Sequence, residues 1–203
     1  MEKETKRKVE TQQGFTILEL LMALSLSLLT LGAALTVYLS QVKTQTLQDN
    51  VITLQSNIRS AGDLLSREIR MAGYDPAGVN KDESSSNDFR VIEVKNNQLM
   101  IHSDLNGNGV MSDPNETITY SYDEGTKTLR RSTGGGRQTV ADHIVSVTFQ
   151  AIDTQGKPVS LASSARGVKI GIEGRTAQPD ASYSQNEGYR TLTWESVVAL
   201  RNK

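Results

Sequence analysis

The residues best suited to chemistry lie in one oxygen-rich segment that begins at Asp104 and ends at Glu116. Counted from Asp104, oxygen-bearing side chains stand at positions 1, 3 and 5, and a glycine stands at position 6. This spacing matches the first half of an EF-hand calcium loop, in which the glycine allows a sharp turn. The expected ligands are Asp104, Asn106, Asn108, the carbonyl of Val110, Ser112, Asp113 and Glu116.

The end of this segment departs from the calcium-loop pattern. The closing glutamate falls at position 13 rather than 12, and Pro114 stands shortly before it. The alternative interpretation is an Asn- and Gly-rich turn between two strands, held by bonds from its side chains to its own backbone. Calcium is therefore the one cofactor that the sequence suggests, and the function inferred below requires none.

The rest of the composition gives little support for an enzyme, and we expect no catalytic residue. The chain has no cysteine, which removes disulfides, thiolate metal sites and a cysteine nucleophile. Residues 134–136 are three glycines, but the Lys-Ser/Thr ending of a phosphate loop is missing. The net charge of −1 predicts no nucleic-acid partner. One small basic cluster near the glycines leaves a DNA contact as an alternative: Arg130, Arg131 and Arg137.

A second chemically notable group is Glu19, the one charged residue in an apolar run from Phe15 to Leu39. As a helix, that run would span about 37 Å, which is enough to cross a hydrocarbon core of about 30 Å. The basic residues that precede the run predict a cytoplasmic N-terminus. The carboxylate could reach the interface by itself. It could also pair with a new amine at Phe15, four residues away on the same helical face, or with a neighbouring subunit's amine.

The stretch around Glu19, Gly14-Phe15-Thr16-Ile17-Leu18-Glu19-Leu20-Leu21, resembles the class III signal of type IV prepilins and type II secretion pseudopilins. The resemblance implies that a membrane prepilin peptidase cuts between Gly14 and Phe15 and methylates the new N-terminus at Phe15. It also implies that Glu19 acts in subunit recruitment and assembly. Residues 1–14 would then be a cleaved cytoplasmic leader, and residues 15–39 a transmembrane and filament-core helix.

Hydrophobic periodicity continues beyond the membrane segment, through residues 40–76. Steps of four and three residues predict an apolar stripe on one helix face. Its members are Leu47, Val51, Leu54, Ile58, Ala61 and Leu65, widened by Leu64 and Ile69. Gly73 can end the helix and Pro76 stops it, so we predict one helix from Phe15 to Ala72. Strand-like segments follow at once, which favours packing of the stripe on a sheet over a coiled coil.

Residues 77–203 are predicted to form an antiparallel β domain, so the fold class is α+β with the helix packed on the sheet. Alternating residues and turn signals predict the strands. These are Phe89–Val94, Leu99–His102, Thr117–Tyr122, Thr128–Arg131, Ile144–Ile152, Val168–Ile172 and Leu192–Leu200. The three glycines at 134–136 read as a flexible break, and residues 175–188 as a long exposed loop. Trp194 is expected in the core.

The helix end, from Asp63 to Tyr74, is similar to that of PilW-type minor pilins, in which Leu-Leu-Ser-Arg, an acid and Ile-Arg-Met-Ala-Gly-Tyr recur. A weaker likeness extends to the C-terminus at Val197–Asn202. The resemblance implies the type IV pilin fold and a structural minor pilin that helps to prime or assemble a type IV pilus. The alternatives are a type II secretion pseudopilin of the J type and a DNA-uptake or adhesion subunit.

The same resemblance implies the partners and the location of the chain. The partners would be other pilins and minor pilins through the N-terminal helix, the prepilin peptidase, the inner-membrane assembly platform and, before assembly, membrane lipid. The location would be the bacterial inner membrane, crossed once with the C-terminal domain in the periplasm. After assembly the protein would lie in the extracellular pilus.

Overall fold

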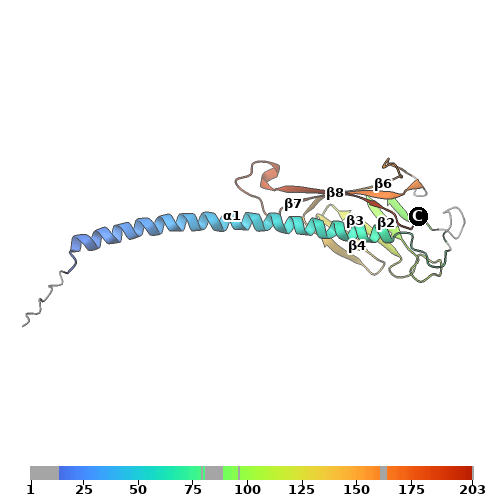
Figure 1. The fold of residues 1–203 in the computed structure, drawn as a ribbon, viewed down its shortest axis with the longest axis horizontal. Helices are drawn as coiled ribbons and strands as arrows, with labels where there is room; N and C mark the ends of the chain where they lie inside the picture. The colour runs from blue at the N-terminus through green and yellow to red at the C-terminus, as the bar shows by residue number, and fades with distance from the viewer. Residues whose placement is uncertain (1–13, 79, 81–88, 96, 161–163, 203) are drawn as a thin grey trace, which may run out of the picture. The chain divides into compact units, whose positions relative to one another are not determined.

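The computed structural model describes residues 14–78, 80, 89–95, 97–160 and 164–202. The described residues contain one α-helix, α1, from Ile17 to Met71, and the strands follow it (Figure 1). The prediction was a helix from Phe15 to Ala72. The observed helix is shorter than this by two residues at its start and one at its end, a difference usual at helix ends. The leader at residues 1–13 and most of the loop at 77–88 lie outside the described residues.

The chain divides into two compact units, residues 1–46 and 47–203. In the first unit, every described residue from 14 to 46 is exposed. This part of α1 contains an 18-residue window with a mean hydropathy of 2.1, long and apolar enough to cross a membrane. Burial inside the protein therefore does not explain why these residues are apolar.

The strands of the second unit form two antiparallel sheets. The five-stranded sheet has the order β1-β2-β3-β4-β5, and the three-stranded sheet has the order β6-β7-β8. In the first sheet the strands are β1 (Ile92–Lys95), β2 (Gln98–His102), β3 (Thr117–Asp123), β4 (Thr128–Ser132) and β5 (Arg137–Ala141). In the second sheet they are β6 (Ile144–Ile152), β7 (Gly167–Arg175) and β8 (Thr191–Ala199). The predicted α+β class is confirmed, with the strands divided between two sheets.

Each predicted strand overlaps an observed one, and β5 is the strand that the sequence did not reveal. Residues 137–139 of β5 are exposed, and Ala141 is its one buried residue. Its sequence therefore lacks the apolar alternation that marks a half-buried strand. The three glycines at 134–136 lie between the end of β4 and the start of this edge strand. They therefore belong to the turn that connects two neighbouring strands.

One face of α1 supplies the centre of the core. Its buried residues are Leu54, Ile58, Ala61, Gly62, Leu65 and Ile69. They belong to a single apolar cluster that also includes Leu99 and Leu129 from the first sheet and Ile170 from the second. The predicted packing of the helix stripe on strands is confirmed, although Leu47 and Val51 at its start are only half-buried.

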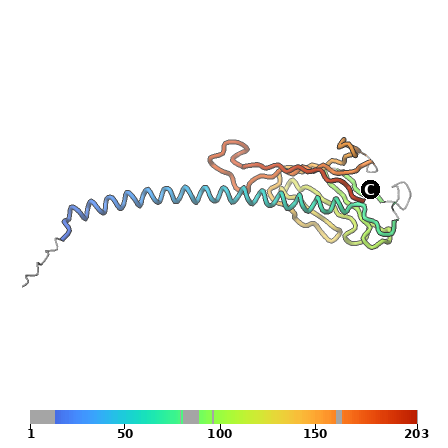
Figure 2. Tube along the Cα trace, viewed as in Figure 1, coloured from blue at the N-terminus to red at the C-terminus, as the bar shows by residue number. Residues whose placement is uncertain are grey.

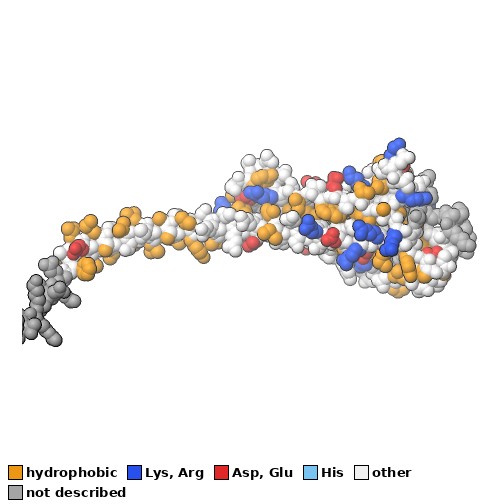
Figure 3. Space-filling view, viewed as in Figure 1, with side chains coloured by type: hydrophobic (Ala, Val, Ile, Leu, Met, Phe, Trp, Pro, Cys, Tyr) orange, Lys and Arg blue, Asp and Glu red, His pale blue; other side chains and the backbone are white. Residues whose placement is uncertain are grey.

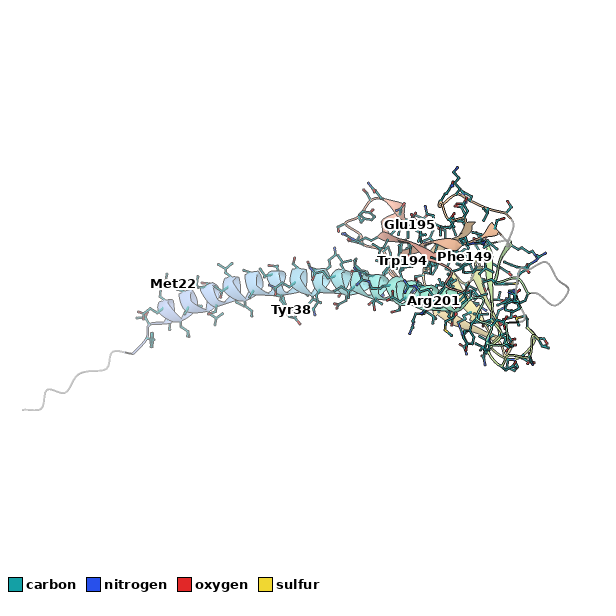
Figure 4. All side chains as sticks on the ribbon, turned by 45° about the vertical axis from the view of Figure 1, so that its right-hand side comes forward. Met22, Tyr38, Phe149, Trp194, Glu195 and Arg201 are labelled. Carbon is teal, nitrogen blue, oxygen red and sulfur yellow. The ribbon has the colours of Figure 1, made fainter. Side chains whose placement is uncertain are left out.

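Helix α1 and strand β8 approach each other closely at Gly62. A Cβ atom built on Gly62 would lie 2.5 Å from Cζ2 of Trp194. Trp194 is partly buried and packs against the core, as predicted, and Figure 4 shows it beside the helix. The indole ring therefore occupies the space that a side chain at Gly62 would need.

This contact predicts that Gly62→Val lowers the free energy of unfolding by about 1–3 kcal/mol, because overpacking forces the ring or the helix to shift. Thermal or urea unfolding followed by circular dichroism measures the change. Gly135→Val is the matched control, since nothing lies within 4 Å of a Cβ there. Equal stability of the two variants would contradict the close packing at Gly62.

Candidate functional site

Gly14 and Phe15 lie in an exposed, non-helical stretch immediately before α1. The side chain of Phe15 is 92% exposed. A Cβ atom on Gly14 would meet no other heavy atom within 4 Å, so the fold of the described residues does not require glycine at this position. The peptide bond predicted to be cut is therefore accessible, while its cleavage and the methylation of Phe15 stay predictions.

Glu19 is bound to Thr16 at the start of α1. The backbone N–H and the hydroxyl of Thr16 donate to Oε2 of Glu19 at 2.9 and 3.0 Å. The N–H of Glu19 donates back to the hydroxyl of Thr16 at 3.2 Å. This reciprocal pair is a capping box, which satisfies two backbone donors that the first helical turn leaves free. The Thr-x-x-Glu spacing that specifies this capping box is visible in the sequence.

The surface of the first unit is apolar almost throughout. Figure 3 shows hydrophobic side chains along this part of α1, with one acidic group near its start. The hydroxyl groups in the run donate to carbonyls one turn earlier, as Ser27 does to Ala23 at 2.7 Å and Thr36 to Ala33 at 2.8 Å. These bonds satisfy the polar groups without water, which suits a helix in lipid or against other helices.

In the second unit, Glu68 of α1 joins the helix to the five-stranded sheet. Oε1 of Glu68 lies 2.7 Å from Nη2 of Arg131 in an ion pair, and it accepts a hydrogen bond from Nε of Arg131 at 2.9 Å. The hydroxyl of Tyr120 donates to Oε2 of Glu68. Burial, strengthened by the Glu68 carboxylate, raises the pKa of Tyr120 far above its ordinary value, so the phenol remains a donor. The acid of the helix-end stretch thus has a structural role.

This pairing changes the interpretation of the basic cluster. Arg131 is held by Glu68, whose hydrogen bond raises the pKa of the guanidinium. Arg130 forms an ion pair with Asp123 at 3.2 Å. The charges of two of the three arginines are thus compensated within the unit, which weakens the DNA-contact alternative.

The end of α1 meets the C-terminal residues. Gly73 has a φ of 73°, in the left-handed region, and its N–H donates to the carbonyl of His102 at 2.8 Å. The side-chain amide of Asn202 donates to the carbonyl of Ala72 at 3.2 Å. Figure 2 shows the C-terminal stretch running to this end of the helix. The two stretches on which the predicted PilW-type resemblance rests are therefore in contact, although they lie far apart in the sequence.

The loop at residues 175–188 is mostly exposed, as predicted, but it is anchored by a buried carboxylate. Asp180 is 2% exposed, and its Oδ2 receives Nη2 of Arg190 at 2.9 Å. Its Oδ1 receives the N–H and hydroxyl of Ser182. These bonds lower the pKa of Asp180 to about 2. The hydrogen bond from the Ser182 side chain has the largest effect, and the bond from Arg190 is next. A helical turn, η2 (Asn186–Gly188), closes the loop.

The oxygen-rich segment connects β2 and β3, and Asp104 organises its first half. Asp104 is fully buried. Its Oδ1 accepts the N–H of Gly107 at 2.6 Å and that of Asn108 at 3.2 Å, while Oδ2 accepts the N–H of Gly109 at 2.8 Å. Gly107 and Gly109 have φ values of 79° and 74°, which explains why glycines occupy these two positions.

The second half of the segment folds back onto the first. Oδ2 of Asp113 accepts the side-chain amides of Asn106 and Asn108, each at 2.7 Å, and these donors lower the pKa of Asp113. Glu116 is 1% exposed, and its Oε1 accepts the N–H of Leu105 at 2.9 Å and that of Asn106 at 3.3 Å. The segment is thus a closed loop with Asp104 and Glu116 buried beneath it.

The predicted ligands are only partly assembled in this loop. Asp104, Asn106, Asn108, Asp113 and Glu116 are joined by the bonds above, whereas Ser112 and the side chain of Val110 are exposed. Within the described part of the chain, no group of three or more His, Cys, Asp or Glu side chains is placed to hold a metal. Calcium binding stays a prediction, and the hydrogen bonds also fit the alternative of a self-bonded turn.

Comparison with known proteins finds a matching family profile and a similar solved structure. A family profile described as prepilin peptidase-dependent protein B matches residues 47–191, more than half of the chain. Among solved structures, a type IV-like pilin from Thermus thermophilus is similar, with a TM-score of 0.43 and 11% identity over 73% of this chain and 97% of that one. No curated protein matches the sequence significantly. The family match lies outside the Gly14–Glu19 stretch and is therefore independent of it.

The contact between Glu68 and Arg131 can be tested by a double-mutant cycle. Arg131→Met should destabilise the protein by roughly 1–3 kcal/mol, because it leaves the Glu68 carboxylate largely buried without its cation. Adding Glu68→Gln to that variant should recover part of the loss, a coupling that unfolding curves of all four proteins measure.

Arg130→Met is the control for this cycle. It removes the more exposed pair with Asp123, and we expect a loss of at most about 1 kcal/mol. Additive losses in the Glu68 and Arg131 cycle would show that the two side chains do not stabilise each other.

Proposed function

The chain belongs to the prepilin peptidase-dependent protein B family, and on that premise we propose that it is a minor pilin of the PilW type. The family makes it a pilin-like protein. The proposal adds that prepilin peptidase removes residues 1–14, that Phe15 is then methylated, and that the mature chain joins a type IV pilus and helps to prime its assembly. No catalytic activity is part of this function.

The observation that carries the proposal is the fully exposed apolar segment of α1, which is headed by Gly14-Phe15 and carries the single acid Glu19. A soluble domain does not leave such a segment uncovered, because exposed apolar surface of this extent marks a membrane or a protein partner. In the proposed function, lipid covers the segment before assembly and the helices of other pilins cover it afterwards.

The proposed location follows from the same segment. The protein would cross the inner membrane once, with its N-terminus in the cytoplasm and residues 47–203 in the periplasm, where the assembly platform recruits it. It would then reach the outside as part of the pilus. A pseudopilin of the J type would share this pathway, so the first alternative differs in the filament that it joins.

The second alternative, a DNA-uptake or adhesion subunit, has less support. The ion pairs of Arg130 with Asp123 and of Arg131 with Glu68 leave the predicted cluster with little unbalanced charge. Nucleic-acid affinity depends on cations that are free to neutralise phosphates. The structural role is therefore the proposal that the described residues support best.

If the peptidase cuts after Gly14, Gly14→Val should stop processing. Mass spectrometry should then find the leader retained in the variant, whereas the wild-type chain should begin at methylated Phe15. Folding should not change, because a side chain at Gly14 meets open space. Gly32→Val is the matched control, since Gly32 also has no heavy atom within 4 Å of a Cβ. Normal cleavage of the Gly14 variant would contradict the proposed processing.

The role of Glu19 can be separated from its capping of the helix. Glu19→Gln removes the charge but keeps a residue that suits the capping box, whereas Thr16→Val keeps the charge and removes the hydroxyl that caps it. If the charge recruits the subunit, Glu19→Gln should remain in the membrane and be missing from sheared pili, and Thr16→Val should be incorporated. Incorporation of Glu19→Gln at the wild-type level would overturn the assigned role.

A further inference from the structure

Among the described residues of the second unit, two buried carboxylates lack a cationic partner. Asp180, which is as deeply buried, pairs with Arg190 at 2.9 Å, and the half-buried Glu68 pairs with Arg131 at 2.7 Å. Asp104 and Glu116 are 0% and 1% exposed, and within the described part of the chain neither lies within 4.0 Å of a cationic side chain. Burying a carboxylate is costly unless a counter-charge accompanies it.

One oxygen of Glu116 is also left without a hydrogen bond. Oε1 accepts the N–H groups of Leu105 and Asn106, whereas Oε2 is buried and has no partner. Oε2 belongs to the same carboxylate as Oε1, whose two donors lie in the first turn of the loop. Buried polar atoms in folded proteins are nearly always satisfied, and an exception indicates a missing water or ion.

The surrounding atoms favour a hard cation. Asp104 keeps unused acceptor capacity on Oδ2, which accepts one N–H, whereas Oδ1 already accepts two. The side-chain carbonyls of Asn106 and Asn108 and the backbone carbonyl of Val110 add neutral oxygens at the same loop. The chain has no cysteine, and the nearby His102 contacts Thr117 through Nδ1, so a ligand set for a softer metal is missing from the loop.

We propose that the Asp104–Glu116 loop binds one calcium ion, with the carboxylates of Asp104 and Glu116 as its charged ligands. Asn106, Asn108 and the carbonyl of Val110 complete its oxygen ligands. Calcium fits better than magnesium, because calcium accepts many oxygens in a flexible arrangement and magnesium demands a near-ideal octahedron. Carboxylates alone do not form the site, in agreement with the lack of a three-acid cluster among the described residues.

Binding would require a local change at Asp113. Oδ2 of Asp113 now holds the amide nitrogens of Asn106 and Asn108 on the same side of the loop. Rotation of these two amides would free Asp113 as a further ligand. It would also break the bonds in which Oδ1 of Asn106 accepts the N–H of Asn108 at 3.0 Å and Oδ1 of Asn108 accepts the N–H of Val110 at 2.8 Å. The change would therefore involve these three side chains and the two backbone N–H groups that the amide oxygens now accept.

The ion would stabilise the junction between α1 and the five-stranded sheet. The N–H of Asp104 donates to the carbonyl of Tyr74 at 2.8 Å, and that of Gly73 donates to His102 at 2.8 Å. Ser103 donates to the carbonyl of Glu116 at 2.9 Å, which brings the two ends of the loop together. A cation between Asp104 and Glu116 would therefore hold the loop closed and, through it, the turn that follows the helix.

The test uses the full-length chain, purified in detergent and stripped with a chelator. Equilibrium dialysis against radioactive calcium should find one ion per chain, with a dissociation constant of about 10⁻⁴–10⁻³ M, as in extracellular calcium modules. Calcium should also raise the melting temperature, and the same concentration of magnesium should not. Glu116→Gln should weaken calcium binding at least about tenfold, the factor that corresponds to about 1.4 kcal/mol.

Two further variants separate ligand loss from misfolding. Asn108→Ala changes an exposed ligand and should weaken binding without unfolding the protein. Asp153→Asn is the matched control, because Asp153 bonds the N–H groups of Gln155 and Lys157 in another turn and should leave binding unchanged. The proposal is overturned if the wild-type chain takes up no calcium at about 10 mM, or if Glu116→Gln and Asn108→Ala both bind like the wild type. Equal uptake of magnesium would overturn the assignment to calcium.

Discussion

The packing of one face of α1 against both sheets is the contact on which the second unit depends. Leu65 and Ile69 are fully buried, and they share one apolar cluster with residues from both sheets. The helix therefore supplies the side chains that give both sheets a common core. Gly62 is part of the same requirement, because Trp194 of the second sheet occupies the space beside it.

The first unit meets a different physical requirement with the same kind of backbone. A helix satisfies its own N–H and C=O groups, so it is stable in lipid as well as in water once its side chains are compatible. Here the hydroxyls bond back to the helix, and the capping box of Thr16 and Glu19 satisfies donors of the first turn. What remains is apolar surface with no cover inside its own unit, which is the property that a membrane-anchored and then assembled subunit needs.

Two ion pairs in the second unit each hold one part of the fold in place. Glu68 and Arg131 join the helix to the first sheet, and Asp180 and Arg190 fix the loop before β8. The loop between β2 and β3 is the exception, because Asp104 and Glu116 are as deeply buried and lack a cation within the described residues. The same loop bonds to the end of α1, so its closure affects the junction of helix and sheet.

The sequence by itself determined the features that depend on neighbours along the chain. Helical periodicity identified the buried face from Leu54 to Ile69, and local turn signals located most of the strands. Strand β5 was missed because its exposed residues carry no apolar alternation, whereas the capping box is specified locally by the spacing of Thr16 and Glu19. Only the tertiary structure decided that Arg131 binds Glu68, that Asn202 caps the end of α1 and that Glu116 lies under the turn begun by Asp104. The reason is physical: these partners are brought together by sheet pairing and helix packing, and no pattern of spacing along the chain reports which distant residues will meet.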